Sequence, residues 1–173
     1  MNKAKNSSGD QFAGQIADQI QVELHQAFSP FALAAGPYTV SLNTDGTASV
    51  NIPASFSANY YIVLKHRNSI ETWSASAVPF SGNTLSYNFS NSATQAYGSN
   101  LKLIAGKCLL FASDVNQDGT IDSGDLVAVD NAASNFVSGY IANDANGDGI
   151  VNADDLLLVG SNVTLFVAKK TPQ

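Results

Sequence analysis

The chain has 173 residues, of which 45% are hydrophobic, and this is enough for one packed domain with a small additional module. Its formal net charge is −6, and eight of the fourteen acidic residues lie in two short stretches, residues 114–125 and 144–155. The eight Lys and Arg residues are too few and too scattered for a nucleic-acid-binding surface. We expect no membrane span, because no run of eighteen apolar residues is present.

The N-terminal part begins with a polar stretch and continues with alternating residues. Residues 1–15 are rich in Asn, Ser, Gly and Gln and are predicted to be a flexible arm, or a donor arm that reaches a neighbour. From residue 16 the pattern alternates, with Ile20, Val22 and Leu24 on one face. This alternation predicts a half-buried strand.

Further strands are predicted at short intervals. Residues 38–42 alternate, the sequence NTDG at 43–46 is a turn signal, and residues 48–52 should return as the second strand of a hairpin. The run YYIVLK at 60–65 is the most β-prone in the chain and is expected to form a central strand.

Additional β-prone runs at 69–73, 85–89 and 101–112 bring the total to about seven strands. We therefore predict a mainly β fold, an immunoglobulin-like β-sandwich over residues 16–112. It should be joined without a linker to a small α-helical module over residues 113–173.

The C-terminal module contains two stretches with the spacing of a twelve-residue calcium loop, DVNQDGTIDSGD at 114–125 and DANGDGIVNADD at 144–155. Each places oxygen-bearing groups at loop positions 1, 3, 5, 9 and 12, and a main-chain carbonyl at position 7 completes the set. Surface turns rich in Asx residues are the alternative, but two matches in tandem argue against it. We predict two Ca²⁺ ions, which would bring the net charge to about −2. The predicted ligands are Asp114, Asn116, Asp118, Thr120, Asp122, Asp125, Asp144, Asn146, Asp148, Ile150, Asn152 and Asp155.

Two other loop positions support this interpretation. Gly119 and Gly149 occupy position 6, where the loop turns sharply. Ile121 and Val151 occupy position 8, and we expect both side chains to point into the core. Both loops end in Asp where an ordinary EF-hand has Glu, so the shorter side chain must bring the following helix closer.

The repeat continues beyond the loops, because residues 126–137 align with residues 156–167. Two calcium loops, each followed by a helix, resemble a type I dockerin. The resemblance implies that the loops bind two calcium ions and that a cohesin partner is recognised through loop positions 10 and 11 and the helices. Those positions are Ser123 and Gly124, then Ala153 and Asp154, which differ from the matched hydroxyl or apolar pairs of many cellulosomal dockerins.

The order of segments resembles the C-terminal region of large secreted bacterial surface proteins, in which a sandwich precedes a dockerin-like pair. The segments are SPFAL, YYIVLKHRNSIETWSA, TQAYGSN and DVNQDG. The resemblance implies an extracellular or cell-surface location. In those proteins a hydrophobic strand precedes the segment matching Ile20–Leu24, whereas here the polar arm takes its place. The sandwich is then one strand short, and its open edge could accept a strand from a neighbour.

No catalytic site is predicted. His66, Arg67, Ser69 and Glu71 surround one turn, whereas the members of a catalytic triad usually come from distant segments. We expect Arg67 and Glu71 to form an ion pair across the turn.

Cys108 lies in an apolar run and should be buried. Trp73 and the tyrosines Tyr60, Tyr61, Tyr87 and Tyr97 are expected to fill the core rather than form a sugar-binding platform.

These observations predict a non-enzymatic, extracellular, calcium-binding structural protein, first of all a surface or filament subunit that assembles with copies of itself. One alternative is a dockerin that binds a cohesin-like scaffold partner, and exposed, mutually symmetric side chains on the two helices would favour it. Another is a carbohydrate-binding appendage for a surface glycan, which requires a row of exposed aromatic side chains.

Overall fold

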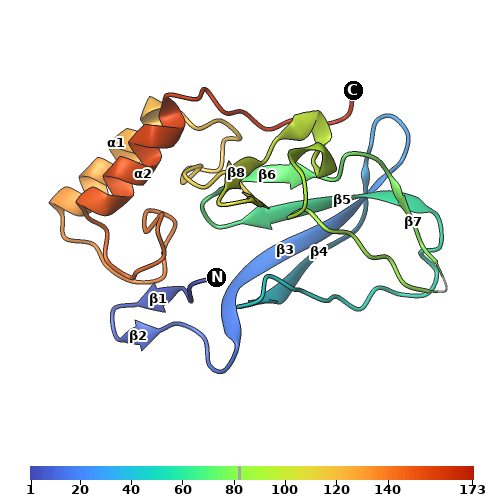
Figure 1. Ribbon diagram of the computed structural model, residues 1–173, viewed down its shortest axis with the longest axis horizontal. Coiled ribbons are helices and arrows are strands. Elements are labelled where there is room, and N and C mark those ends of the chain that lie inside the picture. Colours follow the sequence, from blue (N-terminus) through green and yellow to red (C-terminus); the bar gives the residue numbers. More distant parts are fainter. Residues whose placement is uncertain (82) are drawn as a thin grey trace.

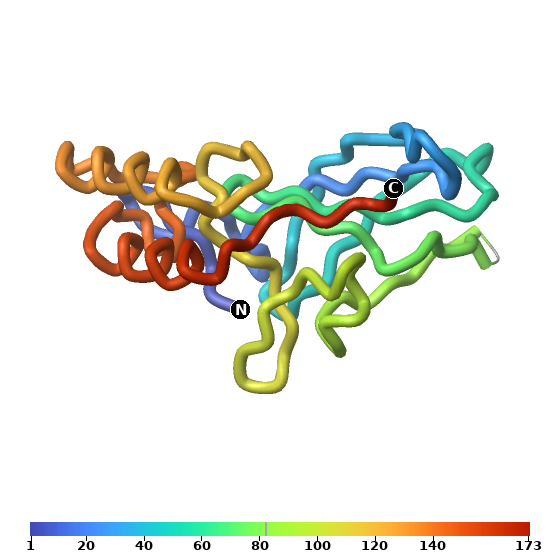
Figure 2. The backbone as a smooth tube through the Cα atoms, turned by 90° about the horizontal axis from the view of Figure 1, so that it is seen from above, coloured from blue at the N-terminus to red at the C-terminus, as the bar shows by residue number. Residues whose placement is uncertain are grey.

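The computed structural model describes residues 1–81 and 83–173 and places a β-rich region beside a module of two helices (Figure 1). The helices α1 (Ser123–Ser134) and α2 (Ala153–Val163) lie side by side at one end of the molecule, and the main sheet occupies the other end (Figure 2). The predicted order, a β-rich region followed by a small helical module, is confirmed.

The main sheet has five antiparallel strands. Its strand order is β4-β3-β5-β6, and a short strand, β7, also pairs with β5. Residues 60–65 therefore form part of a central strand, as predicted. The strands are β3 (Ile16–Gln26), β4 (Leu33–Asn43), β5 (Asn59–His66), β6 (Ser69–Trp73) and β7 (Val78–Pro79).

The core of the sheet lies on the face that the alternation of β3 predicts. Ile20, Val22 and Leu24 are buried, and they pack with Ala35 of β4 and Ile62 of β5. Side chains of this size contribute roughly 1.5–3 kcal/mol each when fully buried, so this face is what holds the sheet to the segments that cover it.

The second sheet of the predicted sandwich is not formed by strands in the part of the chain that is described. The turn at 43–46 is present, since the Gly46 N–H donates to the Asn43 carbonyl at 2.9 Å. However, residues 48–52 are not in a strand. In the sheet, β4 is an edge strand that pairs with β3, and residues 48–52 do not pair with its other edge. Residues 85–89 also lie outside any strand. An immunoglobulin-like topology is therefore not established.

The chain between β7 and the first calcium loop contains only short elements. They are two 3-10 helices, η1 (Ala93–Gln95) and η2 (Tyr97–Ser99), and a hairpin of β8 (Lys102–Ile104) and β9 (Lys107–Leu109). Cys108 in β9 is buried, as predicted.

The N-terminal arm does not extend freely into solvent. It forms a small hairpin of β1 (Lys5–Asn6) and β2 (Gly9–Asp10) that packs against the second predicted calcium loop. The Lys5 N–H donates to the Gly147 carbonyl at 2.9 Å. At Gly149 a Cβ atom would lie 2.6 Å from the Asn6 carbonyl oxygen, so only glycine allows this close approach.

A separate apolar cluster joins the sheet to the helical module. Ile70 of β6 is fully buried against Ile121 of the first loop and Val167 of the C-terminal tail. Its main-chain N–H donates to the Phe111 carbonyl at 2.8 Å. This cluster is therefore an apolar contact through which the two regions stabilise each other.

Replacing Ile70 with Ala should lower the free energy of unfolding by about 2–5 kcal/mol, because it opens a cavity in this cluster. Chemical denaturation measures the change. Ile104→Ala is the matched control, since Ile104 is 48% exposed and its truncation should cost less than about 0.5 kcal/mol. Equal losses for the two variants would contradict the assignment of Ile70 to a buried contact.

Candidate functional site

Both predicted calcium loops end in a helix cap made by two of the predicted ligands. In the first loop, the Asp122 side chain accepts from the Gly124 N–H at 2.6 Å, and the Asp125 carboxylate accepts from the Asp122 N–H at 3.0 Å. Asn152 and Asp155 form the same reciprocal capping box at the start of α2. Loop positions 9 and 12 are thereby held in place by the first turn of each helix.

The middle of each loop is curled by hydrogen bonds from side chains to the main chain. Asn116 Oδ1 accepts from the Asp118 N–H, and Asp118 Oδ1 accepts from the Thr120 N–H, both at 2.9 Å. These bonds turn the side-chain oxygens of positions 3 and 5 toward the inside of the loop. The second loop repeats the bonds with Asn146, Asp148 and Ile150.

The carboxylates at positions 1 and 12 are buried. Asp114 is 2% exposed, and Asp125, Asp144 and Asp155 are completely buried. Within the described residues none of the four forms a salt bridge. Buried carboxylates without a positive partner are strongly unfavourable unless a cation neutralises them.

The cost of burying an unpaired carboxylate is clearest at Asp114. Its Oδ1 atom is buried and has no hydrogen-bond partner among the described residues. Burial, and then the charges of Asp125 and Asp118, raise the pKa of the Asp114 carboxyl to about 6. The ionised form is therefore disfavoured in this site, and a bound dication would remove that penalty.

The twelve predicted ligands thus lie together as two loops, and their chemistry fits a hard cation that prefers oxygen. Within the described residues, no three His, Cys, Asp or Glu side chains form a metal-binding group by themselves. The predicted shells also draw on asparagine side chains and on the Thr120 and Ile150 carbonyls. Calcium binding by these twelve residues stays a prediction.

The two repeats are interlocked through position 8. Ile121 and Val151 are buried, as predicted. The Ile121 N–H donates to the Val167 carbonyl at 2.8 Å, and the Val151 N–H donates to the Val137 carbonyl at 3.1 Å. Each loop is therefore held by the segment that follows the helix of the other repeat, which gives the module an approximate two-fold symmetry.

The helices pack on each other and leave matching faces exposed. Val129 and Val159 are fully buried between the helices, in a cluster whose members all come from the helical module. On the outer side, Val127 and Leu157 are 58% and 71% exposed, and Phe136 and Phe166 are 92% and 88% exposed. Both pairs are thirty residues apart, so each repeat presents the same apolar positions to solvent.

Residues 112–164 match the family model of the dockerin type I domain. The resemblance to a type I dockerin is thereby confirmed, and a β-rich region precedes the dockerin. No match was found among curated proteins or among solved structures. Among the described residues no helix is long and apolar enough to cross a membrane.

A dockerin implies a calcium-binding module of secreted or surface proteins with a cohesin partner. The match favours the cohesin-binding alternative over the self-assembling filament subunit that was predicted first.

The β5–β6 turn attaches the dockerin to the sheet. The buried Asn68 side chain donates to the Asp144 carbonyl at 2.9 Å, and its main-chain carbonyl accepts from the Ser113 N–H at 2.6 Å. The Arg67 Nε donates to the Ile141 carbonyl at 3.2 Å. One turn of the sheet therefore contacts the residues at the start of both calcium loops.

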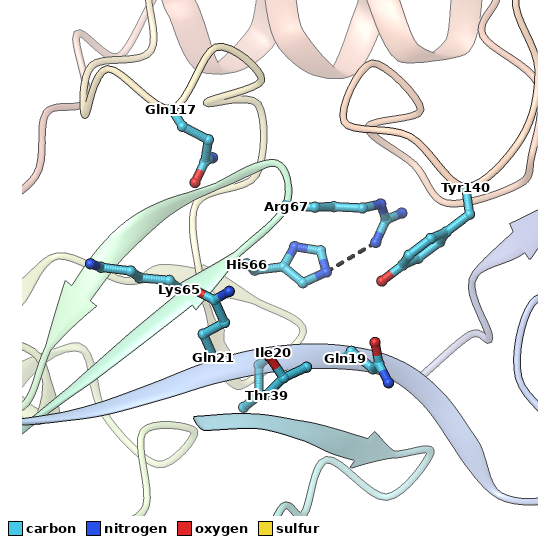
Figure 3. A pocket seen from close by; sticks show the side chains of 9 residues that line it. All are labelled: Gln19, Ile20, Gln21, Thr39, Lys65, His66, Arg67, Gln117 and Tyr140. Atoms are coloured by element: carbon cyan, nitrogen blue, oxygen red, sulfur yellow. Dashed lines mark hydrogen bonds between the residues drawn. The ribbon is translucent and has the colours of Figure 1, made fainter. Parts of the chain in front are cut away.

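Next to this turn, several hydrogen-bond donors surround the Asp18 carboxylate. Tyr140 Oη donates to it at 2.6 Å, His66 Nε2 lies 3.1 Å from it, and Arg67 forms a salt bridge with it. The Arg67 guanidinium also stacks over the Tyr140 ring, 4.4 Å from the ring centre. Figure 3 shows His66, Arg67 and Tyr140 at the edge of a depression between the sheet and the dockerin. Its volume is about 270 Å³.

The predicted Arg67–Glu71 ion pair is wrong. Arg67 turns toward Asp18, and Glu71 instead lies 3.5 Å from Lys65. The roles of Asp18, Asn68 and Tyr140 were missed, because their partners are far away in the sequence and no local pattern marks them.

His66 lies between a serine and an aspartate, the order of a catalytic triad. Its Nδ1 is 3.2 Å from Ser69 Oγ, and its Nε2 faces Asp18. However, Ser69 is only 6% exposed, and Asp18 is already bound by Arg67 and Tyr140. This geometry favours a structural role for the group, and the expected lack of a catalytic site stays a prediction.

Asp18 should make stability depend on pH. Burial by itself raises the pKa of Asp18, but hydrogen bonds from His66 and Tyr140 and the nearby charges of His66 and Arg67 lower it well below its usual value. A depressed folded-state pKa stabilises the fold above the usual aspartate pKa of about 4, and this contribution is lost as the pH falls further. In urea unfolding at pH 7 to 2, Asp18→Asn should be less stable than the wild type at pH 7, and the difference should shrink toward pH 2.

The control for this series is Asp130→Asn, which changes an exposed aspartate on α1. It should follow the wild-type profile. A constant difference between Asp18→Asn and the wild type across the whole range would refute a depressed pKa at Asp18.

Calorimetric titration should find two calcium ions per chain. Asp118→Ala and Asp148→Ala, each at position 5 of one loop, should each remove one site, because each deletes a carboxylate ligand. Asp130→Ala, which leaves both loops intact, should keep two calcium sites.

A chelator should lower the melting temperature of the wild type, since the buried carboxylates lose their counter-charge. In the titration, two calcium ions per chain in both Asp118→Ala and Asp148→Ala would rule out the predicted ligand sets.

Proposed function

We propose that this is a non-catalytic extracellular protein whose dockerin binds a cohesin-like partner in a calcium-dependent manner, while the β-rich region is the body that the dockerin attaches. The observation that carries the proposal is the pair of equivalent apolar faces on α1 and α2. The family match supports it.

The exposed faces have the character of a protein-binding surface. Val127 and Leu157 protrude from the helices, and Phe136 and Phe166 lie just beyond the helix ends. Both phenylalanines have a positive φ, 53° and 51°, a conformation that is strained for this residue type. Large apolar side chains held in strained positions and exposed to water are better explained by a partner than by the stability of the free chain.

The loops give calcium a role in binding. Positions 9 and 12 cap the helices, so filling the loops should fix the first turn of each helix and the residues it exposes. Without calcium the buried carboxylates repel one another, and the helices lose this support. Partner binding should therefore require calcium.

The two faces differ at loop positions 10 and 11. Ser123 and Gly124 place no charge at these positions of the first repeat, whereas Asp154 next to Ala153 places an exposed carboxylate there in the second. Charge differences at the edge of an interface mainly alter partner choice and association rate. The two faces should therefore rank cohesins of different surface charge differently.

The carbohydrate-binding alternative has less support. Trp73 is 6% exposed and its indole N–H donates to Glu71 at 2.7 Å. The tyrosines that could extend a platform, Tyr60, Tyr61, Tyr87 and Tyr97, are half-buried. These aromatic side chains do not provide the exposed row that a glycan platform needs.

Binding to a panel of type I cohesins, measured by calorimetry in millimolar calcium and again with a chelator, tests the proposal. At least one cohesin should bind in calcium only. Because both faces present the same apolar positions, Val127→Asp or Leu157→Asp alone should leave one face usable, whereas the double variant should weaken binding about 30-fold or more. Ile104→Asp, on an exposed part of the β-rich region, is the control. A folded, calcium-loaded protein that binds none of the panel would refute a cohesin-binding function.

A further inference from the structure

The core of the β-rich region is only partly covered. Ile20, Val22, Leu24, Ala35 and Ile62 are buried, but the other apolar side chains packed on this core are only partly buried. In the eleven residues of β4, Ala35 alone is buried. Along β4 the sheet therefore lacks the second layer that would bury its apolar face.

Two segments outside the sheet cross this core with a strand-like pattern. Val50 and Ile52 are half-buried between exposed neighbours. Leu85, Tyr87 and Phe89 repeat the pattern, with exposed residues between them. A period of two is that of a strand with one face on a core, yet Figure 1 draws both segments as plain coil.

The main chains of these segments are unpaired. Among the described residues, no hydrogen bond joins a main-chain N–H or carbonyl of residues 48–52 or 85–89 to another group. Main-chain N–H and carbonyl groups that lie over an apolar core need hydrogen-bond partners. Water can be that partner only while the edges of these two segments stay open to solvent.

The second segment is nevertheless held in position. The Tyr87 hydroxyl donates to the Gln95 carbonyl at 2.6 Å and accepts from the Ala75 N–H at 3.2 Å. Just beyond the segment, the Ser90 carbonyl accepts from the Cys108 N–H at 3.0 Å. The unpaired edge is therefore a fixed feature rather than a loose loop.

The sequence places no charge or proline within these two segments, although Pro53 directly follows the first. No charged residue occurs between Asp45 and Lys65 or between Glu71 and Lys102. Natural proteins usually block open strand edges with charges or proline. Neither is present within residues 48–52 or 85–89, so a strand can approach without desolvating a charge.

We propose that residues 48–52 and 85–89 form an acceptor site for an extended strand of another protein chain, with apolar residues at alternate positions. Its main chain would pair with the open edges, and every second side chain would complete the core, as in strand addition. Residues 1–15 do not fill this role, because they are polar and pack against the second calcium loop. The site lies outside the dockerin and is independent of cohesin binding.

Hydrogen exchange followed at single amides tests the site. The probe is a nine-residue peptide in which valine and threonine alternate between terminal lysines, and the control is the same peptide with N-methyl groups on its internal residues. In the free protein, amides of residues 48–52 and 85–89 should exchange much faster than those of β5. Millimolar unmodified peptide should slow them at least tenfold, whereas the methylated peptide, which cannot donate main-chain hydrogen bonds, should not.

Two outcomes would overturn the proposal: slow exchange of these amides in the free protein, or no protection by the unmodified peptide. Equal protection by both peptides would also overturn it, since it would indicate apolar contact without strand pairing. A cohesin titration on the same sample reports separately on the dockerin.

A pair of variants sharpens the test. Ser86→Pro places proline inside the second segment, and Ser57→Pro places it at an exposed position outside both segments. Ser86→Pro should weaken binding of the unmodified peptide about fivefold or more, whereas Ser57→Pro should not. Equal weakening by the two variants would contradict strand addition at residues 85–89.

Discussion

The structure depends most on four carboxylates that are buried at the ends of two loops. Asp114, Asp125, Asp144 and Asp155 have almost no contact with solvent, and none of them forms a salt bridge with a Lys or Arg among the described residues. Asp125, Asp144 and Asp155 accept hydrogen bonds from main-chain N–H groups, which orders the loops but does not cancel the charge. Buried, unpaired carboxylates are unfavourable unless a cation neutralises them, so the calcium ions that we predict here would be part of the fold rather than added ligands.

The two loops in turn position the helices of the dockerin. Their last residues start α1 and α2, and their position-8 residues lock the two repeats together. Through Asn68 and Arg67 the second loop is also attached to the sheet, and the N-terminal hairpin covers it from outside. If the loops bind calcium as predicted, its removal should affect both the exposed faces of the helices and the contact between the two regions.

The dockerin and the β-rich region each leave apolar surface exposed, but in different geometries. The dockerin buries the inner sides of its helices against each other and exposes matching outer positions, which suits a reversible contact with a folded partner. The β-rich region leaves the main chain of two segments unpaired over a partly covered core, which suits an extended partner. One chain thus offers two surfaces of different geometry, and together they would place it between two neighbours in an assembly.

Features that depend on neighbouring residues could be predicted from the sequence. The curled form of the two loops, the inward position of Ile121 and Val151, and the buried face of β3 each follow from a spacing within a dozen residues, because local geometry decides where such side chains point. Contacts between distant segments could not be predicted. Arg67 pairs with Asp18 rather than with Glu71, the N-terminal arm packs on the second loop, and residues 48–52 leave the sheet although their alternation is that of a strand. Alternation shows that one face is buried, but the pairing of main chains depends on which segments the tertiary structure brings side by side.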